Sequence, residues 1–442
     1  MKKILLICLI ILISFNAFAQ SINLEQAREL ALANSRSLAK YELSIRSSIL
    51  DERNQLFSML PRISAEYRAS IQYFKDWEFI NPADNFTSGA SFSITQIIFQ
   101  GGKSFIQKAI SGIATESIRK DAMAEYFNVL DAVDNAYFAV LEAVAALEAD
   151  ELSLQAAEMG LAIAEIRQSS GMINQGDYLK ALADKESREN SRNQTRRNLA
   201  LSMSRFRSIT GITVAVELEP VNFDMYEDVL ISLAGMSETN ADTLYNNLLL
   251  LLMTSNPSLE KAALNNKRAE MNHSLTIRDY SPTISATIFS TDMVFFNPNG
   301  FNPSSYGGIT IRGTIPLDFW VLANRIERSR IALNSAGIDY NNVVKSLEYD
   351  LLSALSNIYT QAGSVLSSRR SLEYTEKHFE FVMERYRLSL SSVSDLNEAT
   401  SLYINSRNSL NRATYSFLQS LSKLRSLCAL DNEEELLAFF LF

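Results

Sequence analysis

The chain carries the same landmarks twice, in the same order, and this duplication constrains its fold more than any other feature. The segment Pro61–Ala65 returns as Pro282–Ala286, 221 positions later. The segment Arg207–Gly211 returns as Arg425–Ala429, 218 positions later. A repeat of this length is far larger than the unit of a solenoid. The sequence therefore predicts two domain-sized copies of one half.

The start of the chain predicts export from the cytoplasm. Lys2 and Lys3 precede a short apolar run, and Ala17-Phe18-Ala19 fits the small-x-small rule for signal peptidase. We expect cleavage after Ala19, because the run is too short for the alternative, a membrane anchor that stays uncleaved. Of the two cysteines, only Cys428 would remain, so no intrachain disulfide is expected. The formal charge of −9 argues against a nucleic-acid partner.

Each half has the pattern of a helix, a strand, a loop, a second strand, a very long helix and a return helix. The first helix of half one has a capping signal, Asn23 with Gln26, and an interruption near Asn34. The predicted organisation is a signal peptide over 1–19, a first repeat over 20–213 with a β-hairpin at about 61–99, a linker over 214–240, a second repeat over 241–430 with a β-hairpin at about 282–317, and a tail over 431–442. The linker is expected to be irregular. The apolar tail is expected to pack on the helices, with an assembly signal as the alternative.

The first strand region alternates apolar and polar residues without a break. Ile63, Tyr67 and Ile71 belong to the apolar set, and Ser64 and Glu66 to the polar set. The length fits a strand that crosses a bilayer in about 9–11 residues, although an ordinary half-buried strand fits this segment alone equally well. A change of parity near residues 96–98 predicts a bulge or a turn away from the sheet. The predicted membrane-strand residues are Ile63, Tyr67, Ile71, Phe92, Ile94, Ile284, Ile288, Ile309 and Ile311.

Two segments without proline, about 103–170 and 323–389, predict helices on the order of 100 Å long. A turn and a return helix of about 35 residues follow each. Their alanine content permits close helix packing, and a soluble coiled-coil rod is the plainer interpretation.

Two strand pairs cannot close a sheet by themselves. A sheet in lipid must close, because open edges leave backbone groups without hydrogen-bond partners, and the smallest membrane barrels have about eight strands. Several chains must then pool their strands, with two chains giving eight and three giving twelve. The sequence predicts a multi-chain tube with a β end in a membrane and an α end in water.

The chain resembles the TolC-type outer-membrane efflux protein family over essentially its whole mature length. The resemblance rests on Leu24–Ala27, Asn34–Leu38, Leu60–Ala65, Thr95–Lys103, the spacing from Gly171 to Asp177, and Arg207–Gly211. It implies a mainly α protomer with a small β part, assembled as a homotrimer with a twelve-stranded β-barrel and a helical tunnel in the periplasm. It also implies contact with outer-membrane lipid, a periplasmic adaptor (membrane fusion protein) and an inner-membrane pump of the RND, ABC or MFS type. The family usually carries a glycine at the second tip, where this chain has Ser389.

The resemblance implies a periplasmic aperture at the hairpin tips, formed by Asp177, Tyr386, Asp395 and Glu398. Asp395 and Glu398 lie three apart and share a helix face. Helix N-capping is the alternative for Asp177 and Asp395. The arginine that accompanies the tyrosine in the family falls on Ser391, which leaves Arg385 and Arg387 as candidate substitutes.

No catalytic, cofactor or metal site is readable. The two histidines, His273 and His378, lack metal-ligand spacing, and no nucleotide-binding motif surrounds Gly101-Gly102-Lys103. The predicted function is a passive outer-membrane channel of a tripartite export system, extending into the periplasm, for drugs, small molecules or secreted polypeptides. The alternative is a periplasmic helical-hairpin scaffold or adaptor without its own pore. Lipid-type alternation in all four strands favours the channel.

Overall fold

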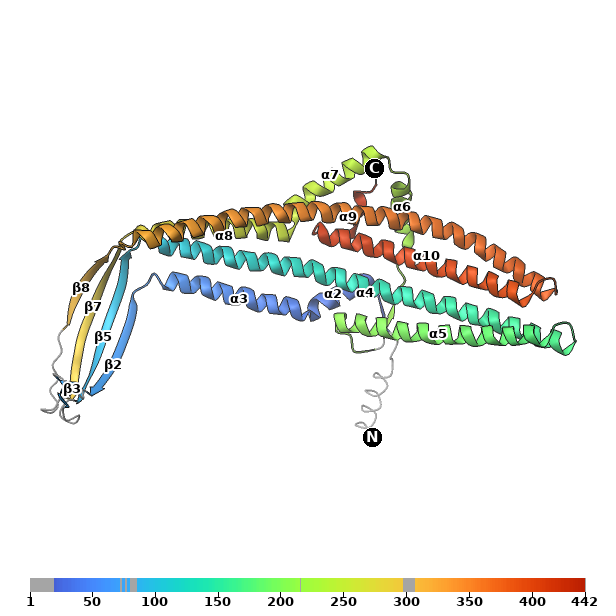
Figure 1. Cartoon of the computed structure of the whole chain (residues 1–442), viewed down its shortest axis with the longest axis horizontal. Helices are drawn as coiled ribbons and strands as arrows, with labels where there is room; N and C mark the ends of the chain where they lie inside the picture. Colours follow the sequence, from blue (N-terminus) through green and yellow to red (C-terminus); the bar gives the residue numbers. More distant parts are fainter. Residues whose placement is uncertain are drawn as a thin grey trace, which may run out of the picture. The chain divides into compact units, whose positions relative to one another are not determined.

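The computed structural model describes residues 20–71, 74–75, 78–79, 86–214, 216–296 and 307–441. The predicted signal peptide and the residue before its cleavage site, Ala19, lie outside the described residues. The described chain is mostly helical (Figure 1), and within it no helix is long and apolar enough to span a membrane. The α-helices are α2 (Leu24–Asn34), α3 (Arg36–Phe57), α4 (Lys103–Ser169), α5 (Gln175–Thr210), α6 (Glu227–Ala234), α7 (Glu238–Ser255), α8 (Pro257–Ile277), α9 (Phe319–Arg387), α10 (Val393–Leu427) and α11 (Glu433–Ala438). The strands are β1 (Gln20–Ile22), β2 (Arg62–Ile71), β3 (Phe74–Lys75), β4 (Glu78–Phe79), β5 (Phe86–Phe99), β6 (Val216–Leu218), β7 (Thr283–Phe296) and β8 (Gly307–Thr314), with 3-10 turns at Phe223–Tyr226 and Arg278–Tyr280.

Local sequence patterns predicted several of these helix boundaries. The predicted break near Asn34 separates α2 from α3, and Asn23 with Gln26 forms the predicted capping box of α2. Helix α4 begins at Lys103, as the proline-free segment indicated, whereas α9 begins four residues before the expected position, at Phe319. The linker is more ordered than expected, because β6 and α6 both lie in it.

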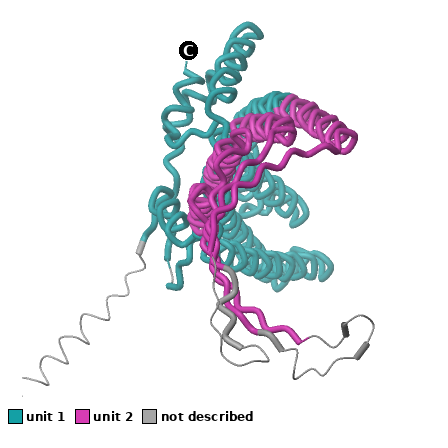
Figure 2. Tube along the Cα trace, turned by 90° about the vertical axis from the view of Figure 1, so that its left-hand side faces the viewer, with its two compact units in different colours: residues 1–39, 123–257, 344–442 teal, residues 40–122, 258–343 magenta. Residues whose placement is uncertain are grey.

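The chain forms two compact units, each assembled from both sequence repeats (Figure 2). The first unit comprises residues 1–39, 123–257 and 344–442, and the second comprises 40–122 and 258–343. Helices α4 and α9 each contribute to both.

The second unit holds a four-stranded antiparallel sheet in the order β2-β5-β7-β8. Its register aligns one isoleucine from every strand in a row across the sheet: Ile63, Ile94, Ile288 and Ile309. The next row is polar and faces the opposite way: Arg62, Thr95, Thr287 and Thr310.

The two faces of this sheet differ in chemistry across its full width. The hydroxyls of Ser64 and Ser93 lie 2.8 Å apart on the polar face, and those of Thr95 and Thr287 lie 3.1 Å apart. The register shift between Ile97 and Phe99 confirms the predicted bulge. All nine predicted membrane-strand residues share the apolar face, because cross-strand partners in an antiparallel sheet point the same way.

Each outer strand of the sheet has one edge with no neighbouring strand among the described residues. Among the described residues, β2 pairs only with β5, and β8 pairs only with β7. The apolar face is also uncovered in the chain, since Ile309 and Ile311 are each 72 % exposed. Within the described chain, the two outer edges of the sheet lack neighbouring strands and its apolar face lacks a packing partner.

The first unit has a conventional buried core. The parallel pair β1–β6 is tied to α4 by the hydroxyl of Tyr137, which donates to the carbonyl oxygens of Ile22 at 3.0 Å and Glu219 at 2.7 Å. Leu436 and Phe440 of the tail are fully buried, so the tail packs on this unit as expected, with Phe442 outside the described residues.

A buried carboxylate, Asp134 of α4, joins three helices of this unit. Arg28 of α2 donates to both of its oxygens, at 2.7 and 2.9 Å. From α10, Arg425 donates at 2.8 Å and the hydroxyl of Ser422 at 2.6 Å. Burial works to lower the pKa of Arg28, but hydrogen bonds and charge from Asp134, together with Glu433, raise that pKa above its ordinary value.

Arg425 depends on Asp134 for its charge balance. It is 1 % exposed, and its Nε and Nη1 atoms have no hydrogen-bond partner within the described part of the chain. Asp134 is the only acid within ion-pair distance of Arg425 among the described residues.

We expect Asp134→Asn to lower the free energy of unfolding by about 3–5 kcal/mol, because it leaves a buried guanidinium without a counterion. Asp131→Asn, one turn earlier on α4, is the matched control, since the side chain of Asp131 is 18 % exposed and reaches Lys423 only at 4.0 Å. Unfolding of the purified protein in detergent, followed by circular dichroism, measures both. Equal midpoints for the two variants would contradict this role for Asp134.

Candidate functional site

The two helical hairpins of the first unit end in turns with the same backbone geometry. In the α4–α5 turn, the N–H of Gly171 donates to the carbonyl of Gln168 at 2.9 Å, and the N–H of Met172 to that of Arg167 at 2.8 Å. In the α9–α10 turn, Ser389 donates to Tyr386 at 3.0 Å, and Leu390 to Arg385 at 2.8 Å. Each pair of bonds is a Schellman motif closed by a left-handed residue, and every participant is shifted by 218 positions.

The return helices also begin alike, and their caps differ from the predicted ones. Asn174 caps α5 by accepting from the N–H of Asp177 at 2.9 Å, and Ser392 caps α10 by accepting from the N–H of Asp395 at 3.1 Å. Neither aspartate is itself the N-cap residue. Asp395 does complete a capping box, because its carboxylate accepts from the N–H of Ser392 at 2.8 Å.

The carboxylates of the α9–α10 tip are available to solvent. Asp395 and Glu398 are both exposed on the first turns of α10, and Asp177 is half-buried at the start of α5. The hydrogen bond from the backbone of Ser392, followed by that from its hydroxyl, holds the pKa of Asp395 below its ordinary value. Asp395 therefore stays charged across the neutral range.

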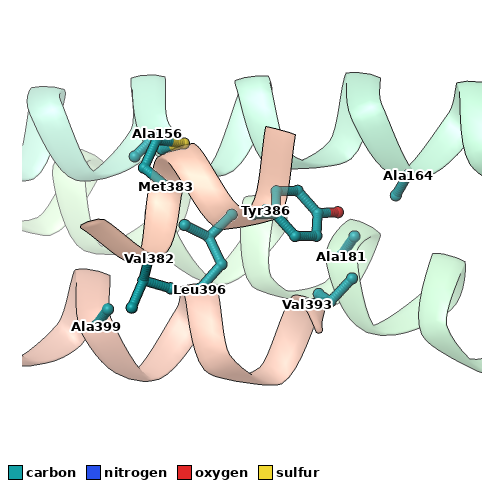
Figure 3. Close-up of a cluster of buried hydrophobic side chains, with 9 residues drawn as sticks. All are labelled: Ala156, Ala164, Ala181, Val382, Met383, Tyr386, Val393, Leu396 and Ala399. Atoms are coloured by element: carbon teal, nitrogen blue, oxygen red, sulfur yellow. The ribbon is translucent and has the colours of Figure 1, made fainter. Parts of the chain in front are cut away.

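Tyr386 is buried at the junction of the two hairpins. Its hydroxyl donates to the carbonyl of Gly160 on α4 at 3.2 Å. Figure 3 shows its ring within a cluster of small and apolar side chains from all four helices: Ala156, Ala164, Ala181, Val382, Met383, Val393, Leu396 and Ala399. Burial raises the pKa of the Tyr386 hydroxyl, and Arg167 opposes the rise.

Arg167, in the last turn of α4, holds Tyr386 in two ways. Its guanidinium carbon lies 4.3 Å from the centre of the tyrosine ring, and its Nη2 donates to the carbonyl oxygen of Tyr386. Tyr386 is 0 % exposed as a result of this packing. The within-chain joint between the hairpins therefore combines a cation–π contact, two hydrogen bonds and apolar packing.

The expected substitutes for the partner arginine do not contact Tyr386. Arg385 donates to the carbonyl of Leu390 in its own turn at 3.0 Å, and Arg387 pairs with Glu384 at 2.9 Å. The hydroxyl of Ser391 donates to the carbonyl of Val382 at 3.4 Å. Sequence reasoning missed Arg167, although the repeat offset of 218 places it opposite Arg385 and thus marked it as a tip residue.

No cluster of metal ligands is present in the part of the chain that the structure describes. It contains no group of three or more histidine, cysteine or acidic side chains able to hold a metal ion. The Nδ1 atom of His273 shares a hydrogen bond of 2.7 Å with the hydroxyl of Ser329. Burial raises the pKa of the Cys428 thiol to about 12, which makes it unreactive.

The chain matches a known protein family over most of its length. The family model described as outer membrane efflux protein matches residues 27–212 and 248–429. Outer membrane protein TolC of Escherichia coli (strain K12) is 23 % identical over 473 residues, covering 99 % of this chain and 88 % of that protein.

Solved structures agree on the fold. The CmeC outer membrane channel of Campylobacter jejuni superposes with a TM-score of 0.73 at 15 % identity, covering 92 % of this chain and 85 % of that one. The open state of the MtrE outer membrane channel of Neisseria gonorrhoeae superposes with a TM-score of 0.69 at 15 % identity, covering 92 % and 89 %.

The two turns offer a reciprocal test of backbone strain. Ser389 has φ 66° and Gly171 has φ 70°, and an added Cβ at Gly171 would meet nothing within 4 Å. We expect Ser389→Gly to stabilise the protein by about 1 kcal/mol and Gly171→Ser to destabilise it by a similar amount, because the left-handed region disfavours a side chain. Thermal midpoints measure both changes, and shifts of the same sign would refute strain as the cause.

Proposed function

The chain belongs to the outer membrane efflux protein family, and on that basis we propose that it is the outer-membrane channel of a tripartite export system. Three copies assemble in this proposal as a homotrimer whose pooled strands form a twelve-stranded barrel. The channel is passive, and cargo is delivered by an inner-membrane pump of the RND, ABC or MFS type through a periplasmic adaptor. The signal peptide is removed after Ala19, which delivers the mature chain to the periplasm.

The two-faced sheet with unpaired edges is the observation that carries this proposal. Its row of four isoleucines forms one continuous apolar band, and the adjacent polar row lies on the opposite face. In a closed barrel the apolar band contacts lipid and the polar face lines the lumen. Closure also supplies partners to the edges of β2 and β8, which a single chain leaves open.

The ends of the sheet add support for a membrane boundary. Where β8 leads into α9, Ile315, Leu317 and Trp320 are each more than half exposed, and Trp320 reaches 73 %. Exposed aromatic and aliphatic residues at the end of a lipid-facing sheet are typical of the interface between hydrocarbon and water. A soluble periplasmic scaffold has no use for such a belt.

The hairpin tips form the periplasmic aperture in this proposal. Asp395 and Glu398 provide an acidic ring, because three chains bring three copies of each to one opening. Asp177 lies at the other tip, and Tyr386 holds the two hairpins of each chain together. The capping box of Asp395 is compatible with this role, because it fixes the carboxylate while leaving it exposed.

We expect Ile309→Lys on β8 to block assembly in the outer membrane. A cation on the lipid face costs about 2–4 kcal/mol near the midplane. Thr310→Lys is the matched control on the polar face of the same strand. Fractionation and mild-detergent electrophoresis measure the membrane-bound trimer, which only Ile309→Lys should deplete. A natural chain that is recovered as a soluble periplasmic monomer would instead support the scaffold function.

We expect polyvalent cations on the periplasmic side to reduce single-channel conductance in planar bilayers. Like charges around a narrow opening attract cations. Asp395→Asn with Glu398→Gln should weaken this block and preserve the cap, since an amide oxygen still accepts the hydrogen bond. Glu373 is an exposed acid that pairs with Lys377 on α9, and Glu373→Gln should leave the cation block unchanged. An undiminished block in the double variant would remove both acids from the aperture.

A further inference from the structure

The two hairpin tips have the same construction but different surroundings. Hairpin one (α4–α5) receives Tyr386 of hairpin two (α9–α10) on a face that includes Gly160, Ala164 and Arg167. Hairpin two has a corresponding face of its own. Nothing in the described part of the chain occupies it.

That corresponding face is hollowed into a groove of about 440 Å³. Its lining residues are His378, Phe381, Val382, Arg385, Ser391, Asp395 and Glu398. Subtracting the repeat offset of 218 from the first six gives Gly160, Ile163, Ala164, Arg167, Ile173 and Asp177.

These six equivalents are the surroundings of Tyr386. Gly160 and Arg167 bond to Tyr386 directly, Ala164 belongs to its buried cluster, and Ile163 and Ile173 pack against that cluster. The negative charge of Asp177 helps to raise the pKa of the Tyr386 hydroxyl. The groove is therefore a second, unfilled copy of the seat that holds Tyr386.

Arg385 stands in this second seat where Arg167 stands in the first. It is exposed, its Nη2 donates to the carbonyl of Leu390 in its own turn, and its guanidinium carbon lies 5.6 Å from the centre of the Phe381 ring. The residue equivalent to Tyr386 is Gln168, whose carbonyl accepts from Gly171 as that of Tyr386 accepts from Ser389.

We propose that the groove of hairpin two binds hairpin one of a second copy of this chain, with Gln168 seated in it and Arg385 donating to the Gln168 carbonyl oxygen. This interface rests on the proposed trimer, because cyclic symmetry places hairpin one of each chain beside hairpin two of the next. Arg385 is then the between-chain counterpart of Arg167.

The between-chain joint is more polar than the within-chain joint. The side chains that hairpin two presents to hairpin one include Met383, Tyr386 and Val393, all of them buried. Their repeat equivalents on hairpin one are Glu165, Gln168 and Gln175. Less apolar area is removed from water at such a joint, so it separates more readily.

Thiol cross-linking tests the register of this interface. Gln168→Cys with His378→Cys, treated with a short bis-maleimide, is expected to give covalent dimers and trimers on denaturing gels. Gly160→Cys with Tyr386→Cys is the within-chain equivalent and should stay monomeric. Ile166→Cys with His378→Cys should also stay monomeric, because Ile166 lies on another face of α4. The natural Cys428 is buried and does not compete.

Two arginines supply a second readout. In the Gln168→Cys, His378→Cys background, Arg385→Ala should slow cross-linking by about tenfold, the effect of losing one hydrogen bond from a charged donor. Arg387→Ala should leave the rate unchanged, since Arg387 pairs within its own helix.

The outcomes separate this interface from the proposed function. A trimer in mild detergent that gives no cross-link, or that cross-links equally through Ile166→Cys, overturns the interface and leaves the channel intact. A protein that forms no trimer overturns both.

Discussion

The unpaired edges of β2 and β8 are the constraint on which the rest of the molecule depends. Four strands with one apolar face and one polar face leave backbone donors and acceptors open on both sides. Among the described residues, no further strand lies beside either edge to satisfy those groups. In the proposed trimer, strands from further copies of the same chain satisfy them. The function proposed for the chain follows from this geometry, and the family relationship agrees with it.

Duplication has not kept the two halves equivalent. Asp134 joins α2, α4 and α10, yet its repeat equivalent is Leu352, which is 58 % exposed. Arg425 has an arginine equivalent, Arg207, whose Nε atom has no hydrogen-bond partner among the described residues. The tips retain the shared backbone geometry, whereas the buried acid Asp134 of the first repeat has no acidic equivalent in the second. One acidic residue, Asp134, therefore balances the two buried arginines Arg28 and Arg425 of the first unit, and the second repeat has no acid at the equivalent position.

The sequence predicts those features that depend on local patterns. Alternation along the strands identified the apolar face, and the register of the sheet places all nine predicted residues on it. Capping chemistry at Asn23 and a break near Asn34 located α2 and α3. In the linker, β6 and α6 escaped notice because Pro220 and the acidic residues suggested a loop.

Contacts between distant segments were not predictable in the same way. Arg28 and Asp134 are separated by 106 positions, and Arg167 and Tyr386 by 219, so no periodicity links either pair. The repeat offset could have identified Arg167 as a tip residue, but only packing reveals what it holds. Asp177 and Asp395 were expected as possible caps, and the caps are their neighbours Asn174 and Ser392.

The Tyr386 seat has a consequence for how a ring of such chains opens. Within each chain the seat is filled, and Tyr386 and Arg167 tie the two hairpins to each other by two hydrogen bonds. In the proposed trimer, the six hairpins are therefore joined as three pairs, one pair from each chain. Three pairs meet at three between-chain contacts, and a substitution in one of these contacts is repeated in all three. In the proposed trimer, opening therefore separates the three contacts between chains, while the buried contacts around Tyr386 hold each pair of hairpins together.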